Sequence, residues 1–141
     1  MRYLALDVGD ERIGIAISDP NALLARPLET VLRRPGPSSF LRIAQIIEEK
    51  DVEAVVVGLP LLPKGTEGKQ VLSTRAYVRG LKRHIGTPIV YQDERSSTLR
   101  AKEIMIQNRT GRRRRRRLND AVAAAVILQE YLDDRSEGKT W

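Results

Sequence analysis

The sequence lacks cysteine and has little histidine. No cysteine occurs among the 141 residues, which excludes disulfide bonds, thiolate zinc sites and a cysteine nucleophile. The one histidine, His84, lies in the segment LKRHIG at a predicted helix end, where a basic residue near the terminal carbonyl groups is common. Acid–base chemistry must therefore depend on carboxylates, lysine, tyrosine or a metal ion.

Long apolar runs are also missing. No segment approaches the length of a membrane span, and the first residues lack the apolar core of a signal peptide. We therefore expect a cytoplasmic protein with no membrane association. A hydrophobic content of 41% over 141 residues favours one domain, residues 1–141, with a substantial core.

Positive charge is abundant and unevenly distributed. The net charge is +7, and between Thr98 and Arg117 nine basic residues accompany one acid, Glu103. The densest part is an unbroken run of arginines: Arg112, Arg113, Arg114, Arg115, Arg116 and Arg117. Adjacent like charges repel, so such a run is typical of a segment that binds a polyanion, and we predict nucleic acid as the partner. A solvated basic loop is the alternative.

Aromatic residues make up only 4% of the chain. They provide no obvious platform on which bases could stack. We therefore expect recognition of the nucleic acid backbone or of its shape.

The first strand presents a carboxylate. The segment RYLALDV alternates leucine with other residues, which predicts a strand with Asp7 on the face opposite the leucines. Gly9 follows, and alternation resumes at Ile13, so the two runs are typical of a hairpin. A carboxylate in an apolar strand requires a cation or hydrogen-bond donors. The alternative is that Asp7 only accepts hydrogen bonds from the turn.

The remaining periodicity predicts alternating helices and strands. In the first half of the chain we expect a strand over 23–32, a helix from Ser38, a buried strand over 52–59 and a loop over 60–68. In the second half we expect a helix reaching Ile85, a strand over 89–92 and a helix capped by Ser97 or Thr98. The arginine run then links that helix to a last helix from about 119 to 134. A strand, a helix and a buried strand in succession imply a parallel crossover. The predicted fold class is α/β, with a five-stranded mixed sheet flanked by helices.

Three acids are expected at one edge of this sheet. Asp7 and the Asp93-Glu94 pair follow strands that end at the same edge if they are parallel, and the last helix can bring Asp120 to it. Oxygen ligands without cysteine or histidine suit Mg²⁺ or Mn²⁺. Two such ions support phosphodiester cleavage. The alternative for Asp120 is a helix-capping role, which Asn119 could also fill.

Four motifs carry a resemblance to a known family. DVGDERIGIAISD, VVGLP followed by GTEG, DERSST and NDAVAAAVILQ occur in the order found in the YqgF (RuvX) family, which the chain resembles from residue 2 to about residue 133. The resemblance implies a ribonuclease H-like fold related to that of the resolvase RuvC. It also implies a nuclease that trims the 5′ end of the small-subunit (pre-16S) ribosomal RNA precursor, with ribosomal particles as partners.

The resemblance assigns residues by position. Asp7, Glu94 and Asp120 match the catalytic, metal-binding acids, and Arg12 and Arg95 match flanking basic residues that bind substrate. The chain departs from the family pattern at Ser96, where a larger apolar residue is usual, and in its heavier run of arginines.

Three functions compete at this point. The first is a metal-dependent nuclease acting on RNA or branched DNA, and the second is a non-catalytic RNA-binding assembly factor. The third is an actin-like ATPase, because DVG resembles its phosphate loop, but 141 residues leave no room for the second domain such proteins need. The sequence leaves open RNA or DNA, endo- or exonuclease action, Mg²⁺ or Mn²⁺, monomer or homodimer, and whether Asp93 or Glu67 joins the metal site.

Overall fold

The computed structural model describes residues 1–61, 68–94 and 112–136. The elements follow in the order β1 (Arg2–Val8), β2 (Arg12–Ser18), β3 (Ala25–Leu32), α1 (Ser38–Lys50), β4 (Val52–Leu59), α2 (Lys69–Leu81), β5 (Ile89–Asp93) and α4 (Arg112–Ser136). The helix predicted from Ser97 or Thr98 and most of the predicted loop over 60–68 lie outside the described residues.

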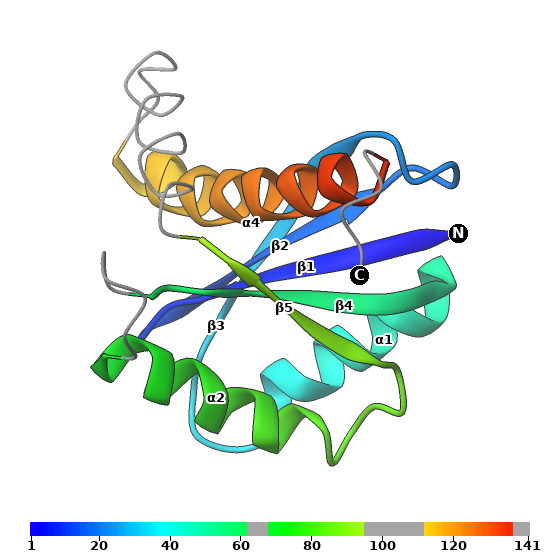
Figure 1. Cartoon of the computed structure of the whole chain (residues 1–141). Helices are drawn as coiled ribbons and strands as arrows, with labels where there is room; N and C mark the ends of the chain where they lie inside the picture. The colour runs from blue at the N-terminus through cyan, green and yellow to red at the C-terminus, as the bar shows by residue number, and fades with distance from the viewer. Residues whose placement is uncertain (62–67, 95–111, 137–141) are drawn as a thin grey trace.

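One mixed sheet forms the middle of the molecule (Figure 1). The strand order is β3-β2-β1-β4-β5, with β1, β2 and β3 antiparallel and with β4 parallel to both β1 and β5. The predicted fold class is confirmed, and β3, which contains Pro27, lies at an edge of the sheet. Because β1, β4 and β5 are parallel, their carboxyl ends lie at one rim of the sheet, on the left of Figure 1.

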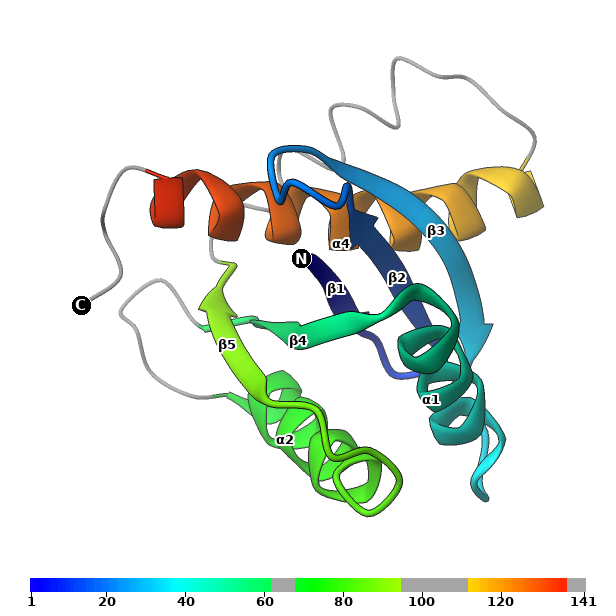
Figure 2. The same ribbon diagram turned by 90° about the vertical axis from the view of Figure 1, so that its right-hand side faces the viewer.

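Helices cover both faces of the sheet (Figure 2). Leu4 and Leu6 belong to the core under α1 and α2, whereas Tyr3 and Ala5 belong to the core under α4. The alternation along β1 therefore assigns its residues to two cores, as a period of two requires. Asp7 follows the second set, which is the face covered by α4.

Glycine allows α4 to lie directly on the sheet. A Cβ atom at Gly14 would stand 1.8 Å from the backbone oxygen of Asp120, so no larger residue fits there without moving the helix. The alanines Ala121 and Ala124 on the buried side of α4 are small enough for the same approach. The buried side of α4 therefore packs directly on β2.

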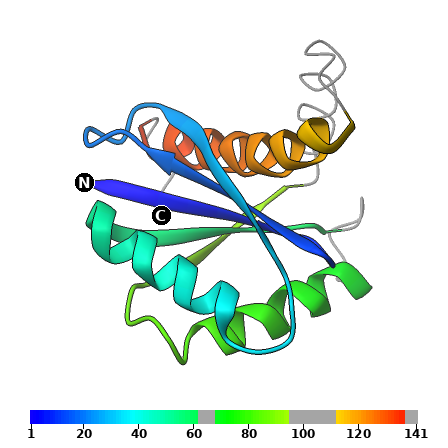
Figure 3. The same ribbon diagram turned by 180° about the vertical axis from the view of Figure 1, so that it is seen from behind.

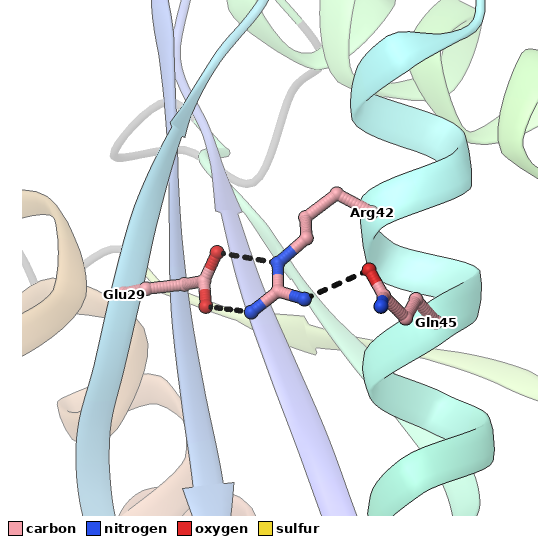
Figure 4. Close-up of polar contacts among 3 residues, drawn as sticks. All are labelled: Glu29, Arg42 and Gln45. Carbon is pink, nitrogen blue, oxygen red and sulfur yellow. Dashed lines mark hydrogen bonds and ion pairs between the residues drawn. The ribbon is translucent and has the colours of Figure 1, made fainter.

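The two helices of the opposite face are held in different ways (Figure 3). Arg42 of α1 makes a bidentate ion pair with Glu29 of β3, at 2.6 and 2.9 Å, and donates a third hydrogen bond to Gln45 at 2.9 Å (Figure 4). Helix α2 packs on α1 at Gly80, where a Cβ atom would stand 2.6 Å from Cζ of Phe40.

The arginine run is not a link between helices, as the sequence had suggested. It forms the first turns of α4, which begins at Arg112 and not near Asn119. Arginine is a good helix former, and six in succession contain no proline, glycine or capping residue that would stop the helix.

Two other predicted boundaries were wrong. Helix α2 ends at Leu81 and not at Ile85, because the chain turns where the N–H of His84 donates to the carbonyl of Leu81 at 2.8 Å. Strand β3 begins at Ala25 and not at Leu23. The reason is that the Asp19 carboxylate accepts the N–H of Leu23 at 2.7 Å and holds the preceding residues in a loop.

The sequence predicts no membrane-spanning segment. Within the described ranges, no helix has both the length and the apolar surface needed to cross a bilayer.

Candidate active site

The rim at the carboxyl ends of β1, β4 and β5 brings the three predicted acids together. Asp7 pairs with Gly14 of β2, and the backbone of Asp120 lies directly on that glycine. On the other side of β1, Gly58 of β4 is next to Glu94, whose Oε2 lies 2.7 Å from where a glycine Cβ would be. Asp7 is therefore flanked by Asp120 and Glu94.

Asp7 lies in a partly buried position. Burial raises the pKa of Asp7 to about 6, and the charge of Asp120 adds to the shift. Both causes disfavour the ionised carboxylate. The predicted role of Asp7 as a simple acceptor for the turn would lower its pKa, so the environment favours the functional alternative.

Glu94 is the only acidic residue of the described chain that is buried, with 6% of its surface exposed. Its backbone N–H donates to the carbonyl of Leu59 at 3.3 Å, which holds the residue at the end of β5 beside β4. Burial raises the pKa of Glu94 to about 8, and the charges of Asp7, Asp93 and Glu130 contribute further. Without a cation, this carboxyl is mostly protonated at neutral pH.

Asp120 has a cationic partner. Its Oδ2 accepts a hydrogen bond from Nε of Arg12 at 2.6 Å, and the two side chains are 21% and 29% exposed. Nη1 of Arg12 also lies 3.7 Å from Oε2 of Glu11. Arg12, which the sequence assigned to substrate binding, therefore contacts one of the three acids in the structure.

Long-range hydrogen bonds support the end of β1. Nε2 of Gln70 donates to the carbonyl of Val8 at 3.1 Å. Nη1 of Arg33 donates to the carbonyl of Gly9 at 3.0 Å and to Oγ of Ser73 at 2.8 Å. These contacts join the turn after Asp7 to α2. Sequence reasoning missed them, since no local pattern links residues this far apart.

Another missed residue is Glu130 of α4. Its charge contributes to the raised pKa of Glu94, so it lies on the same side of the helix as the site. The available signal was helical spacing, because Glu130 lies three residues after the buried Ile127. Asp93, which the sequence left as an optional ligand, is exposed.

The other residues that the sequence singled out lie in several different places. Arg95 and Glu67 lie outside the described residues. The backbone of Arg112 to Arg117 is at the start of α4, at the same rim as the acids (Figure 1). His84 stacks on Phe40, with ring centroids 5.2 Å apart, and so has a packing role.

The donor set matches a hard divalent cation in its chemistry. It consists of carboxylate oxygens, and two of the three carboxyls are in an environment where ionisation requires compensating positive charge. In the described ranges, no three acidic or histidine side chains are already arranged around one ion position. The three-carboxylate metal site therefore stays a prediction.

Comparison with known proteins identifies the family. The family model described as "RuvX: Holliday junction resolvase" matches residues 1–134. The chain belongs to the RuvX family. A relative from Desulforamulus reducens is 44% identical over 133 residues, which are 94% of this chain and 97% of the relative. A relative from Fusobacterium nucleatum is 45% identical over 134 residues, covering 94% and 96%. Both are named "Putative pre-16S rRNA nuclease".

Solved structures place the RuvX chain in a fold class. RuvC from T. thermophilus in complex with a Holliday junction aligns with a TM-score of 0.59 at 17% identity, over 96% of each chain. The Fowlpox virus resolvase bound to junction DNA aligns with a TM-score of 0.57 at 14% identity, over 96% of this chain and 99% of the resolvase. The fold is ribonuclease H-like, as the sequence resemblance implied.

Proposed function

We propose that this RuvX chain is a single nuclease domain, residues 1–141, that hydrolyses phosphodiester bonds with the help of a divalent metal ion. Its substrate is the precursor of 16S ribosomal RNA, which it trims at the 5′ end in the cytoplasm, with precursor ribosomal particles as its partners. The observation that supports this most directly is the placement of Asp7 between the buried Glu94 and the ion-paired Asp120.

The acids have a defined task in this proposal. Asp7, Glu94 and Asp120 would hold Mg²⁺ or Mn²⁺. Such an ion lowers the pKa of a bound water and stabilises the leaving oxygen of a phosphodiester. The Glu94 carboxyl would lose its proton on binding a cation, because its raised pKa reflects burial and neighbouring negative charge. Arg12 keeps the Asp120 carboxylate oriented through its bond at 2.6 Å.

Substrate binding is assigned to basic residues that the sequence singled out. Arg95 and the run Arg112 to Arg117 would bind phosphates, and Arg12 would do so with the donors that Asp120 does not occupy. Aromatic residues make up only 4% of the chain, so contacts to the nucleic acid backbone are better supported than stacking on bases. Four-way DNA junctions are the second candidate substrate, because the matching family model carries the resolvase description.

Cleavage assays test the proposal. Labelled pre-16S RNA, single strands and four-way junctions would be incubated with Mg²⁺, Mn²⁺ or EDTA. We expect cleavage that requires the metal and that is mostly lost in Asp7→Asn, Glu94→Gln and Asp120→Asn. Asp10→Asn is the matched control, since Asp10 is an exposed acid in the turn directly after β1. Cleavage that survives thorough chelation would overturn the mechanism, and RNA binding without cleavage under every condition would favour an assembly factor.

A further inference from the structure

Helix α2 and the residues after it, as far as Gln92, lack acidic residues. No Asp or Glu occurs between Lys69 and Gln92, although acids make up 18 of the 141 residues. Within this segment Lys69, Arg79, Lys82 and Arg83 are exposed. We call these four residues the α2 basic face.

The packing of α2 directs this face into solvent. Val71, Val78 and Leu81 are buried against the sheet, with at most 1% of their surface exposed. At 100° per residue, the buried positions occupy one arc of the helix, and Lys69 and Arg79 lie on the opposite arc. Lys82 and Arg83 follow directly after the last residue of the helix and are exposed. The Gly80 contact with Phe40 fixes this rotation, because a turn of the helix about its axis would break it.

The α2 basic face has no neutralising partner in the described part of the chain. The ion pairs found there involve Arg12 and Arg42, and none includes Lys69, Arg79, Lys82 or Arg83. Arg42 illustrates the contrast, because both of its pairing nitrogens are satisfied by Glu29 (Figure 4). A cluster of like charges destabilises the folded state through repulsion unless a polyanion neutralises it. The positive potential of this face favours an acidic ligand.

The position of α2 indicates which ligand this is. Its first turn meets the candidate active site, where Gln70 donates to Val8, and the helix then runs away from the rim across the face opposite α4 (Figures 1 and 3). The arginine run starts α4 at the same rim, on the other face of the sheet. A chain of phosphates that crosses the rim can therefore contact both.

We propose that the α2 basic face is a second binding surface for the phosphate backbone of a nucleic acid, along an arm that leads away from the site of cleavage. The choice of nucleic acid over other polyanions rests on the proposed function. Helix α2 has 13 residues and is about 20 Å long, which corresponds to about six phosphates of one strand measured along the axis of a duplex. The face carries no exposed aromatic residue, so the contact is independent of base sequence.

A matched pair of double variants tests the surface. Arg79→Gln with Arg83→Gln removes two charges from the α2 basic face. Arg26→Gln with Arg34→Gln removes two exposed arginines from β3 and the residues after it, so the change in net charge is equal. Affinity of the full chain for a duplex RNA would be measured in EDTA at several salt concentrations, so that binding is separated from cleavage.

For the α2 variant, the slope of log affinity against log salt concentration should become shallower by up to about 1.8 for a duplex, because each lost phosphate contact removes about 0.9 from the slope. The control variant should leave the slope unchanged. Arg79→Lys with Arg83→Lys retains the charge and should retain the slope, which guards against a loss of folding. Equal slopes in the α2 and control variants would overturn the proposal, and so would an unchanged RNA affinity together with a loss of binding to phosphatidylserine vesicles.

The salt-slope and cleavage experiments test the α2 basic face and the nuclease assignment independently. If the slope difference is found but no substrate is cleaved with Mg²⁺ or Mn²⁺, the surface stands and the nuclease assignment fails. If cleavage is found and the slopes are equal, the nuclease stands and the surface does not exist.

Discussion

Glu94 owes its properties to its immediate neighbours. Its Oε2 and Cδ1 of Ile127 in α4 both lie next to Gly58, at 2.7 and 2.5 Å from the position where a Cβ atom of residue 58 would stand. Any side chain at residue 58 would occupy the space of the carboxyl. The glycine of the VVGLP motif is therefore needed for a close approach and not for a special backbone angle.

The raised pKa values of Asp7 and Glu94 predict an unusual pH dependence. Folding lifts the pKa of Glu94 from 4.5 to about 8 and that of Asp7 from 3.8 to about 6, so the folded protein binds more protons than the unfolded chain between these limits. The free energy of unfolding without metal should then fall as pH rises from about 4 to 8, by on the order of a few kcal/mol. Urea denaturation in EDTA across this range measures it.

Glu94→Gln is the informative variant for this pH dependence. It removes the larger of the two shifts while keeping the shape of the side chain, so its stability should vary less with pH above 6. A parent protein whose stability rises steadily from pH 4 to 8 would contradict the burial of an uncompensated carboxyl.

At the level of elements, the contact between α4 and β2 determines where Asp120 lies. The helix backbone fills the space above Gly14, which leaves no room for a methyl group. Gly14→Ala should therefore lower the free energy of unfolding by about 3 kcal/mol, at the upper end of the usual range for overpacking, because a helix backbone cannot yield as a side chain can. Gly86→Ala is the control, since no atom lies within 4 Å of its added Cβ.

Chemical denaturation of these two glycine variants measures the difference. Cleavage should also fall in Gly14→Ala, because Asp120 moves with the helix. A Gly14→Ala protein as stable as Gly86→Ala would show that α4 does not rest on β2 as described.

The arginine run is expected to lower the stability of helix α4. The first turn of α4 carries no acidic residue, and cations at a helix N-terminus oppose the helix dipole and repel one another at spacings of three and four. Replacing Arg112 to Arg117 with glutamine keeps the helix propensity and should raise stability slightly, by a few tenths of a kcal/mol per residue. The same change should weaken nucleic acid binding and flatten its salt dependence.

Thermal unfolding and binding measured on one glutamine variant decide this trade-off. Loss of binding with unchanged or higher stability is the expected result. An unchanged salt slope would show that the run is a solvated surface, which is the alternative the sequence left open.

At the scale of the whole molecule, metal binding and folding should be coupled. The rim draws acids from β1, the end of β5 and α4, so an ion bound there would join the sheet to α4. Mn²⁺ should raise the free energy of unfolding by about 2.7 kcal/mol at a hundred times its dissociation constant, and should do so far less in Asp7→Ala or Asp120→Ala. In EDTA the same variants should be as stable as the parent or more so, because like charges are removed.

Urea midpoints with and without Mn²⁺, measured beside cleavage rates, test the coupling. Variants that are clearly destabilised in EDTA and still cleave at the parent's rate would show that these acids hold the fold, with the active site elsewhere. For Asp120→Ala, the gain in the free energy of unfolding in EDTA should be the smaller one, because this replacement also removes the ion pair with Arg12.

The sequence by itself determined the parts of this protein that depend on neighbouring residues. The alternation in RYLALDV was enough to predict β1 and the side of the sheet that carries Asp7, because a strand places successive side chains on opposite faces. The family motifs were enough for the fold class. The extent of α4 was missed, because a run of like charges was taken for a linker although arginine favours a helix.

Only the tertiary structure decided the environment of the acids and the use of the basic residues. The pairing of Arg12 with Asp120 joins residues 108 positions apart, and Glu94 is buried because β4 and α4 close over it. The α2 basic face appears only when the helix is packed, since packing decides which side of α2 meets water. A pKa, an ion pair and a charged surface all depend on what lies within a few ångströms in space, and chain order does not specify those neighbours.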